Sequence, residues 1–123
     1  MRCWLSDFSS VGCYKDTIYR AIPTLEGKDA ILDGPYQKRK QPIVKCAVAA
    51  MRAGYGAFAV QNGGWCAASA SALETFDTYG KSSDCKDDGE GGFGANQVYS
   101  FNGIMNNKGC NLYLQDDSIP WGS

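Results

Sequence analysis

Histidine is absent from this chain of 123 residues. The Ser-His-Asp and Cys-His arrangements that activate a nucleophile both need an imidazole to accept a proton, so neither can form here. Paired carboxylates are another route to hydrolysis, and the pairs considered are Asp87 with Glu90 and Asp116 with Asp117. Carboxylates this close in sequence do not define an acid and a base on opposite sides of a substrate. We therefore expect a protein that is not an enzyme.

Long apolar segments are also missing, and neither sign of charge dominates. No apolar run approaches the roughly 20 residues that span a bilayer, and no apolar leader follows Met1. We interpret the sequence as a mature form with an added start methionine, and we expect no membrane span. The net charge is −1, whereas nucleic-acid binding needs a basic face, so no nucleic-acid partner is expected. The cluster Lys38-Arg39-Lys40 is more typical of a solvated turn.

Closely spaced cysteine pairs, the usual sign of a zinc site, do not occur. The chain nevertheless has six cysteines, which are Cys3, Cys13, Cys46, Cys66, Cys85 and Cys110. An even number of well separated cysteines in a small domain is typical of a disulfide framework, which forms outside the reducing cytosol. We therefore expect a secreted, extracellular domain with disulfide bonds. The sequence by itself allows fifteen ways to pair six cysteines.

The clearest secondary-structure signal predicts a helix over residues 42–53. Pro42 suits the first helical position, and Gly54 follows the last one. Between them, apolar residues recur at helical spacing, with Cys46 at the edge of the apolar face. This face is expected to pack on a sheet.

Short strands are predicted before and after this helix. Large and small residues alternate over 57–62, which is typical of a half-buried strand, and Gly63-Gly64 predicts a turn after it. Further strands are expected at 11–15, 95–101 and 111–114, a short helix within 67–79, and long loops at 18–41 and 81–94. A chain of this length is one domain, 1–123. The order of elements predicts an α+β fold, in which a small antiparallel sheet stapled by disulfides carries one principal helix.

The stretch from Gln61 to Cys66 has the residue types of a saccharide site. Sugars present apolar C–H faces and hydroxyl edges, so their sites combine an exposed aromatic ring with a few fixed polar groups. The candidate ligand-binding residues are Gln61, Asn62, Trp65, Tyr14 and Tyr36, with Trp4 and Trp121 as additional aromatic candidates. The alternative for Trp65 is a core position in which its ring covers a disulfide.

The loop over 84–92 combines carboxylates with glycines, and its metal candidates are Asp87, Asp88 and Glu90. Calcium takes six to eight oxygen ligands and suits such a backbone, but the spacing is not that of an EF-hand. Carboxylates on a surface loop are more often simply solvated. We therefore expect no cofactor, and a calcium ion held by these three residues is the alternative.

Several motifs occur in an order that is typical of one family. They are Gly12-Cys13-Tyr14-Lys15-Asp16, Arg20-Ala21-Ile22-Pro23, a helix with Cys46, Gly54-Tyr55, Gly63-Gly64-Trp65-Cys66 and Asn96-Gln97-Val98-Tyr99. Over residues 11–101 the chain thus resembles a WSC domain, and more narrowly the WSC-like modules of secreted animal proteins, notably from marine invertebrates and fish. The resemblance implies an extracellular domain related in fold to PAN/apple modules, with carbohydrate as its ligand.

The resemblance also implies disulfide pairings. The family commonly has two further cysteines, at positions that correspond to Ala50 and Gly64 here. Their joint absence is consistent with the loss of one whole disulfide, which leaves Cys46–Cys66 to join helix and sheet. Cys3 and Cys110 lie outside the resemblance, and a bond between them would tie the two termini together. Cys13–Cys85 would then be the third bond.

Residues and resemblance together predict a secreted, lectin-like module that binds a glycan. The alternative from a different class is a structural or protein-interaction module of an extracellular matrix or adhesive, which would bind an extracellular protein through exposed aromatic residues. A toxin or defence protein is a third alternative that rests on size and cysteine content alone.

Overall fold

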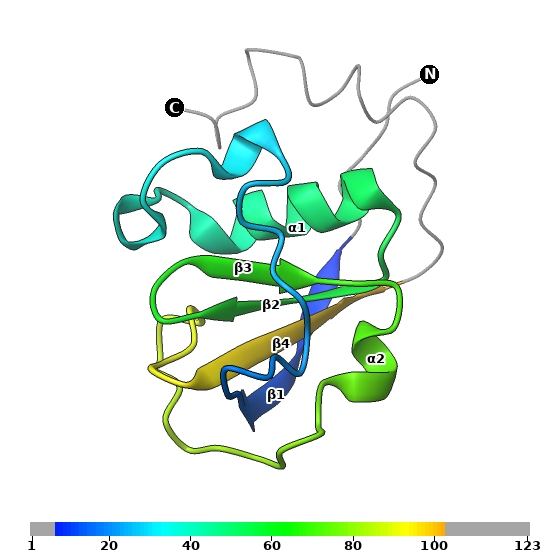
Figure 1. The fold of residues 1–123 in the computed structure, drawn as a ribbon, viewed down its shortest axis with the longest axis vertical. Helices are drawn as coiled ribbons and strands as arrows, with labels where there is room; N and C mark the ends of the chain where they lie inside the picture. Colours follow the sequence, from blue (N-terminus) through cyan, green and yellow to red (C-terminus); the bar gives the residue numbers. More distant parts are fainter. Residues whose placement is uncertain (1–6, 103–123) are drawn as a thin grey trace.

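The computed structural model describes residues 7–102, which fold into a four-stranded antiparallel sheet with one principal helix (Figure 1). In chain order the elements are β1 (Phe8–Lys15), the 3-10 turns η1 (Ala30–Leu32) and η2 (Tyr36–Lys38), α1 (Pro42–Ala53), β2 (Ala57–Gln61), β3 (Trp65–Ala68), α2 (Ala72–Thr75) and β4 (Ala95–Phe101). The strands lie side by side in the order β1-β4-β2-β3. The α+β class predicted from the sequence is confirmed.

Helix α1 spans the residues that the sequence predicts. Pro42 lies in its first turn, where the missing N–H is not needed, and Gln41 before it is left-handed with φ of 50°. Gly54 ends the helix with φ of 84°, and its N–H donates to two carbonyls of the last turn. Cys46 is fully buried, so it lies within the apolar face and not at its edge as predicted.

Strand β2 lies between β4 and β3 and is buried along its whole length. Phe58 and Val60 belong to a core beneath α1, on what we call the α1 face of the sheet. Ala57 and Ala59 belong to a second core on the opposite side, the α2 face. The prediction of a half-buried strand is therefore wrong, because both faces of β2 are covered. The large residues lie on the α1 face and the small ones on the α2 face.

The core on the α1 face is built from large aromatic rings. Phe58 stacks on Tyr99 with ring centroids 5.1 Å apart. Phe8 meets these two rings edge-on at 5.2 and 5.6 Å, and Phe101 packs beside them. Each such pair contributes about 0.5–1.5 kcal/mol beyond the apolar area that it buries.

The core on the α2 face is built mainly from small side chains. Its buried members are Tyr14, Ile22, Ala57, Ala59, Ala67, Ala72 and Val98. Phe76 packs edge-on against Tyr14, with ring centroids 4.8 Å apart. Beside this core the segment 23–25 runs along β3, where the N–H of Leu25 donates to the carbonyl of Cys66 at 3.0 Å. The N–H of Ala68 in turn donates to the carbonyl of Pro23 at 2.9 Å, so the segment is antiparallel to β3 and the chain before it lies near the end of that strand.

A hairpin between β2 and β3 differs from the sequence-based prediction. Asn62 and Gly63 have positive φ values of 52° and 88°, a backbone shape that reverses the chain tightly, and β3 then pairs with β2. The strand at Trp65–Ala68 was not predicted, because four residues rich in alanine carry almost no strand signal. The predicted helix at 67–79 is reduced to α2, which begins after Ser71.

Strands β1 and β4 pair over their whole lengths. The register runs from Phe8 opposite Phe101 to Lys15 opposite Ala95. β4 has the predicted bounds, whereas β1 begins earlier than the predicted 11–15. A bulge between Ser10 and Gly12 shifts the register by one residue, and pairing with β4 continues on both sides of it. The predicted loop 18–41 contains two 3-10 turns, and the predicted strand 111–114 lies outside the described residues.

Two disulfides lie within the described residues. Cys46–Cys66 joins α1 to β3 with its Cα atoms 5.4 Å apart, and Cys13–Cys85 joins β1 to the loop 81–94 with its Cα atoms 6.0 Å apart. Both pairings implied by the resemblance are confirmed. The third implied pairing, Cys3–Cys110, lies outside the residues that the structure describes.

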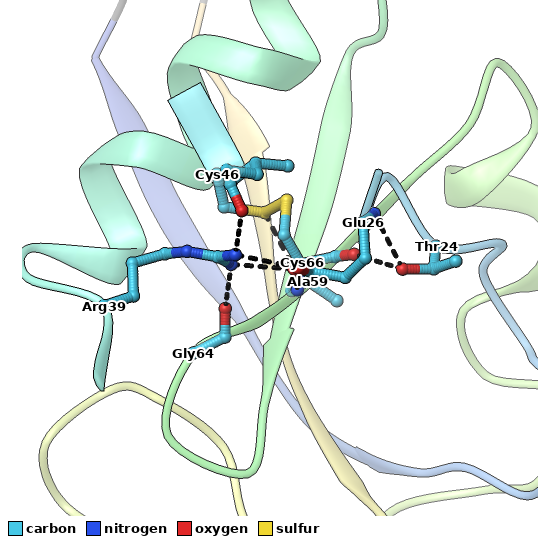
Figure 2. Close-up of a disulfide and its surroundings, with 8 residues drawn as sticks. Thr24, Glu26, Arg39, Cys46, Ala59, Gly64 and Cys66 are labelled. Carbon is cyan, nitrogen blue, oxygen red and sulfur yellow. Dashed lines mark hydrogen bonds and ion pairs between the residues drawn. A yellow bond between two sulfur atoms is a disulfide. The ribbon is translucent and has the colours of Figure 1, made fainter. Parts of the chain in front are cut away.

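A buried ion pair lies next to the Cys46–Cys66 disulfide (Figure 2). Arg39 is 2% exposed and donates to both carboxylate oxygens of Glu26 at 2.7 Å and to the carbonyl of Gly64 at 2.8 Å. Glu26 also accepts the backbone N–H of Cys66 at 2.8 Å. The interpretation of 38–40 as a solvated basic turn is therefore wrong for Arg39, whose guanidinium fastens the long loop to the hairpin.

Candidate functional site

A pocket of about 510 Å³ opens at the end of the sheet where β1 and β2 finish and β4 begins. Its lining combines four large apolar side chains with amide, hydroxyl and charged groups. The lining residues are Asp16, Thr17, Ile18, Arg20, Tyr36, Gln61, Asn62, Trp65, Phe93 and Gly94. Four of the five candidates from the sequence are among them, so residues more than twenty positions apart in sequence meet in one hollow.

Trp65 is half-buried at the start of β3, and Arg20 lies over its ring. The guanidinium carbon of Arg20 is 4.5 Å from the centroid of the Trp65 ring, which is a cation–π contact. One face of the indole is therefore covered by a charged side chain. The ring lines the pocket and packs on the α2-face core, whereas Cys46 and Cys66 belong to the α1-face core, so Trp65 does not cover their disulfide as the core alternative supposed.

A buried carboxylate holds this arrangement in place. Asp16, whose side chain is fully buried, accepts the N–H of Ala21 at 2.9 Å, the Nε2 of Gln61 at 2.9 Å and the Nη1 of Arg20 at 3.1 Å. Gln61 donates its other amide proton to Asn96 at 2.9 Å. With both amide protons used inside the protein, the atom that Gln61 has left for a ligand is its carbonyl oxygen.

The long loop also contributes to the lining of the pocket, through Tyr36. Asn62 donates from Nδ2 to the hydroxyl of Tyr36 at 3.3 Å, which fixes the two polar groups side by side. Because Gly64 has no side chain, η2 can lie close to the β2–β3 hairpin. A Cβ at position 64 would clash with the carbonyl oxygen of Tyr36. Arg39 then anchors the end of η2 to Gly64. Tyr36 is thus placed by the ion pair described above.

Phe93 and Ile18 form the rim of the pocket, and sequence reasoning did not select either of them. Their side chains are 87% and 81% exposed, unusually high values for apolar residues of this size. The N–H of Asp16 donates to the carbonyl of Gly94 at 2.9 Å, which brings the 93–94 turn beside the end of β1. The signal for Phe93 was its setting, a lone aromatic residue among glycines in a polar loop.

Arg20 and Asp16 were also not selected as site residues, although both belong to motifs of the family resemblance. Tyr14, the fifth sequence candidate, is buried in the α2-face core and does not line the pocket. The Tyr14 side chain points to the α2 face of β1, into the core. The sequence of this strand has no clear apolar alternation, so it did not show which face Tyr14 occupies. The remaining candidates, Trp4, Trp121, Asp116 and Asp117, lie outside the described residues.

The acidic loop shapes the pocket through its backbone. The N–H of Gly63 donates to the carbonyl of Glu90 at 3.0 Å, so the loop supports the hairpin turn. Burial raises the pKa of the Glu90 carboxyl above its ordinary value, and the nearby Asp88 carboxylate adds to the shift. Among residues 7–102, no three acidic or cysteine side chains cluster as metal ligands. A calcium ion at Asp87, Asp88 and Glu90, the alternative to the expected absence of a cofactor, is not tested by this finding.

Comparisons with protein-family models, with curated proteins and with solved structures found no match to this chain. Within the described part of the chain, no helix is long and apolar enough to cross a membrane.

Proposed function

We propose that this protein is a secreted, lectin-like module that binds a saccharide in the pocket around Trp65 and catalyses no reaction. The observation that carries the proposal is the meeting of Tyr36, Trp65 and Phe93 with the amides of Gln61 and Asn62 in one hollow of about 510 Å³. The disulfides Cys46–Cys66 and Cys13–Cys85 support an extracellular location. The resemblance to WSC-like modules supports both the saccharide ligand and the extracellular location.

The chemistry of the pocket suits a sugar ring. The exposed Phe93 ring and the Tyr36 ring offer apolar surface to the C–H face of a saccharide. The free carbonyl oxygen of Gln61 accepts a hydroxyl proton, and the side chain of Asn62 both donates and accepts. A few such fixed polar groups set orientation and specificity in an otherwise apolar site.

A glycan array probed with the oxidised protein tests this proposal. We expect binding to a limited set of saccharides, and we expect Trp65→Ala and Phe93→Ala to reduce it at least tenfold, a loss of about 1.4 kcal/mol. Leu73→Ala is the matched control, because Leu73 is an exposed apolar residue of α2 that does not line the pocket. Each array is run in millimolar calcium and again with chelator, which tests the calcium prediction at the same time.

No saccharide bound by the folded protein, or binding that survives both pocket substitutions, would contradict the proposal. Equal binding with and without chelator would contradict only the calcium prediction.

A protein-interaction module is the second candidate, and one observation favours it. Ile18, Tyr19 and Phe93 are all more than three-quarters exposed, and two of them form the rim of the pocket. Exposed apolar side chains gathered in this way are typical of protein-binding surfaces. Free monosaccharide distinguishes the two candidates, since it competes with a lectin ligand and leaves a protein partner bound.

A further inference from the structure

The pocket presents one accessible charge, and that charge is positive. Among the described residues that line the pocket, only Arg20 and Asp16 carry a charge. The side chain of Asp16 is fully buried and accepts three hydrogen bonds from the protein, so it has no surface to offer a ligand. The side chain of Arg20 is 40% exposed. A ligand therefore meets the guanidinium and not the carboxylate.

Arg20 is held in one orientation before any ligand arrives. Its guanidinium carbon lies over the Trp65 ring, 4.5 Å from the ring centroid, and Asp16 accepts from Nη1 at 3.1 Å. A guanidinium carries five N–H donors in a planar fork, and the contact with Asp16 uses only one of the two Nη groups. The remaining edge can pair with a carboxylate through two parallel hydrogen bonds, the geometry in which arginine recognises carboxylates best.

The same contact restricts how a sugar can lie. Because Arg20 covers one face of the Trp65 ring, that face is not available for stacking, and the highly exposed Phe93 ring is the free aromatic surface at the rim. A ring that rests on Phe93 has the amides of Gln61 and Asn62 and the guanidinium of Arg20 within the same hollow. Arg20 and Gln61 both donate to Oδ2 of Asp16, so the part of the pocket beside the Gln61 amide is suited to an anionic substituent.

We propose that the pocket takes an acidic saccharide, such as a uronic acid, and that Arg20 binds its carboxylate. This inference rests on the proposed function and adds the class of ligand. Asp16 then acts as a positioning residue, because it holds the guanidinium in place without touching the sugar. Because Asp16 and Arg20 together carry no net charge, the pocket does not attract anions over a long range. The preference for an acidic over a neutral saccharide therefore depends on a carboxylate that reaches the exposed edge of Arg20.

Calorimetric titration with three matched probes tests this inference. The probes are a galacturonic acid trisaccharide, its methyl ester and the neutral galactose trisaccharide, so that charge varies while shape is nearly constant. We expect the acid to bind roughly tenfold more tightly than the ester, as a charge-assisted hydrogen bond exceeds a neutral one. High salt should reduce this preference.

Substitutions assign the preference to one residue. Arg20→Gln should make the acid and the ester bind equally, and Arg20→Lys should retain part of the preference, because lysine keeps the charge without the fork. Arg52→Gln is the control, since Arg52 is 33% exposed, pairs with Asp29 at 3.4 Å and does not line this pocket. Thermal melting checks that each variant is folded, and Arg20→Lys keeps a partner for Asp16 if Arg20→Gln is unstable.

The outcomes separate this inference from the proposed function. Equal affinity for acid and ester, with both still dependent on Phe93, would overturn the inference and leave the lectin proposal standing. Absence of binding to any saccharide by the folded protein would overturn both. Arg20-dependent binding of a glutamate-rich peptide without saccharide binding would also overturn the acidic saccharide as ligand.

Discussion

The two faces of the sheet are built in different ways. The α1 face carries large aromatic rings, a long helix, the Cys46–Cys66 disulfide and the buried Arg39–Glu26 pair. The α2 face carries mostly alanine, one short helix and loops, and the pocket opens at its edge. The α1 side buries a large apolar area and holds the long loop against the sheet, whereas the pocket side leaves side chains such as Phe93 exposed to solvent. The densely packed part of this small domain and the proposed binding site therefore lie in different places.

The difference shows how a short chain supports an exposed site. Exposed rings contribute little to folding, and an arginine stacked on tryptophan contributes modestly. The Cys46–Cys66 disulfide and the Arg39–Glu26 pair hold the long loop that carries Tyr36, whereas Asp16 holds Arg20 and Gln61. Substitutions on the two sides should consequently separate into those that unfold the protein and those that only weaken binding.

The largest effect is expected from breaking the buried ion pair. Glu26→Gln leaves the buried charge of Arg39 without its carboxylate, which should lower the free energy of unfolding by about 3–5 kcal/mol. Urea denaturation followed by circular dichroism measures the change. Arg52→Gln removes a more exposed ion pair and should cost no more than about 1 kcal/mol. Equal effects of the two substitutions would mean that the pair does not fasten the long loop.

Removing the disulfide between α1 and β3 should have the next largest effect. Cys46→Ala with Cys66→Ala opens a loop with a sequence separation of 20, which should lower the free energy of unfolding by about 3 kcal/mol. The measurement is urea denaturation of the oxidised double variant against the oxidised parent. A loss well below 1 kcal/mol would show that packing alone holds the α1 side together.

Phe93→Ala should separate recognition from stability. Because Phe93 is 87% exposed, its loss should change the free energy of unfolding by no more than about 0.5 kcal/mol, while saccharide binding falls at least tenfold. Denaturation and titration of the same sample check both halves of this statement. A strongly destabilised variant would mean that the rim contributes to the fold.

The smallest effect is expected from the acidic loop. The folded state raises the pKa of Glu90, so it binds a proton there more readily than the unfolded chain does. Ionised Glu90 therefore destabilises the fold at neutral pH, and this penalty disappears as the pH falls through the raised pKa and then the ordinary one. Glu90→Gln should stabilise the protein at pH 7 and have no effect at low pH. Denaturation at several pH values, with Glu74→Gln as an exposed control, tests the sign.

The sequence predicted the α1 side better than the α2 side, for a physical reason. Helix 42–53 has a proline start, a glycine stop and a regular apolar face, which are local signals. Strand β3 is formed by pairing with β2 and with the segment 23–25, which no local pattern records. Trp65 and Asn62 were found because their motif is local. Arg20, Asp16 and Phe93 reach the same pocket only through the pairing of distant strands.

The β1–β4 ladder determines how the pocket would be displayed on a longer polypeptide. Residues 7 and 102 meet at one end of this ladder, where the N–H of Asn102 donates to the carbonyl of Asp7 at 2.7 Å. Asp16 and Gly94 lie at the other end, and the eight steps from residue 102 to Gly94 correspond to about 27 Å of extended strand. Flanking sequence would thus attach on the side opposite the pocket.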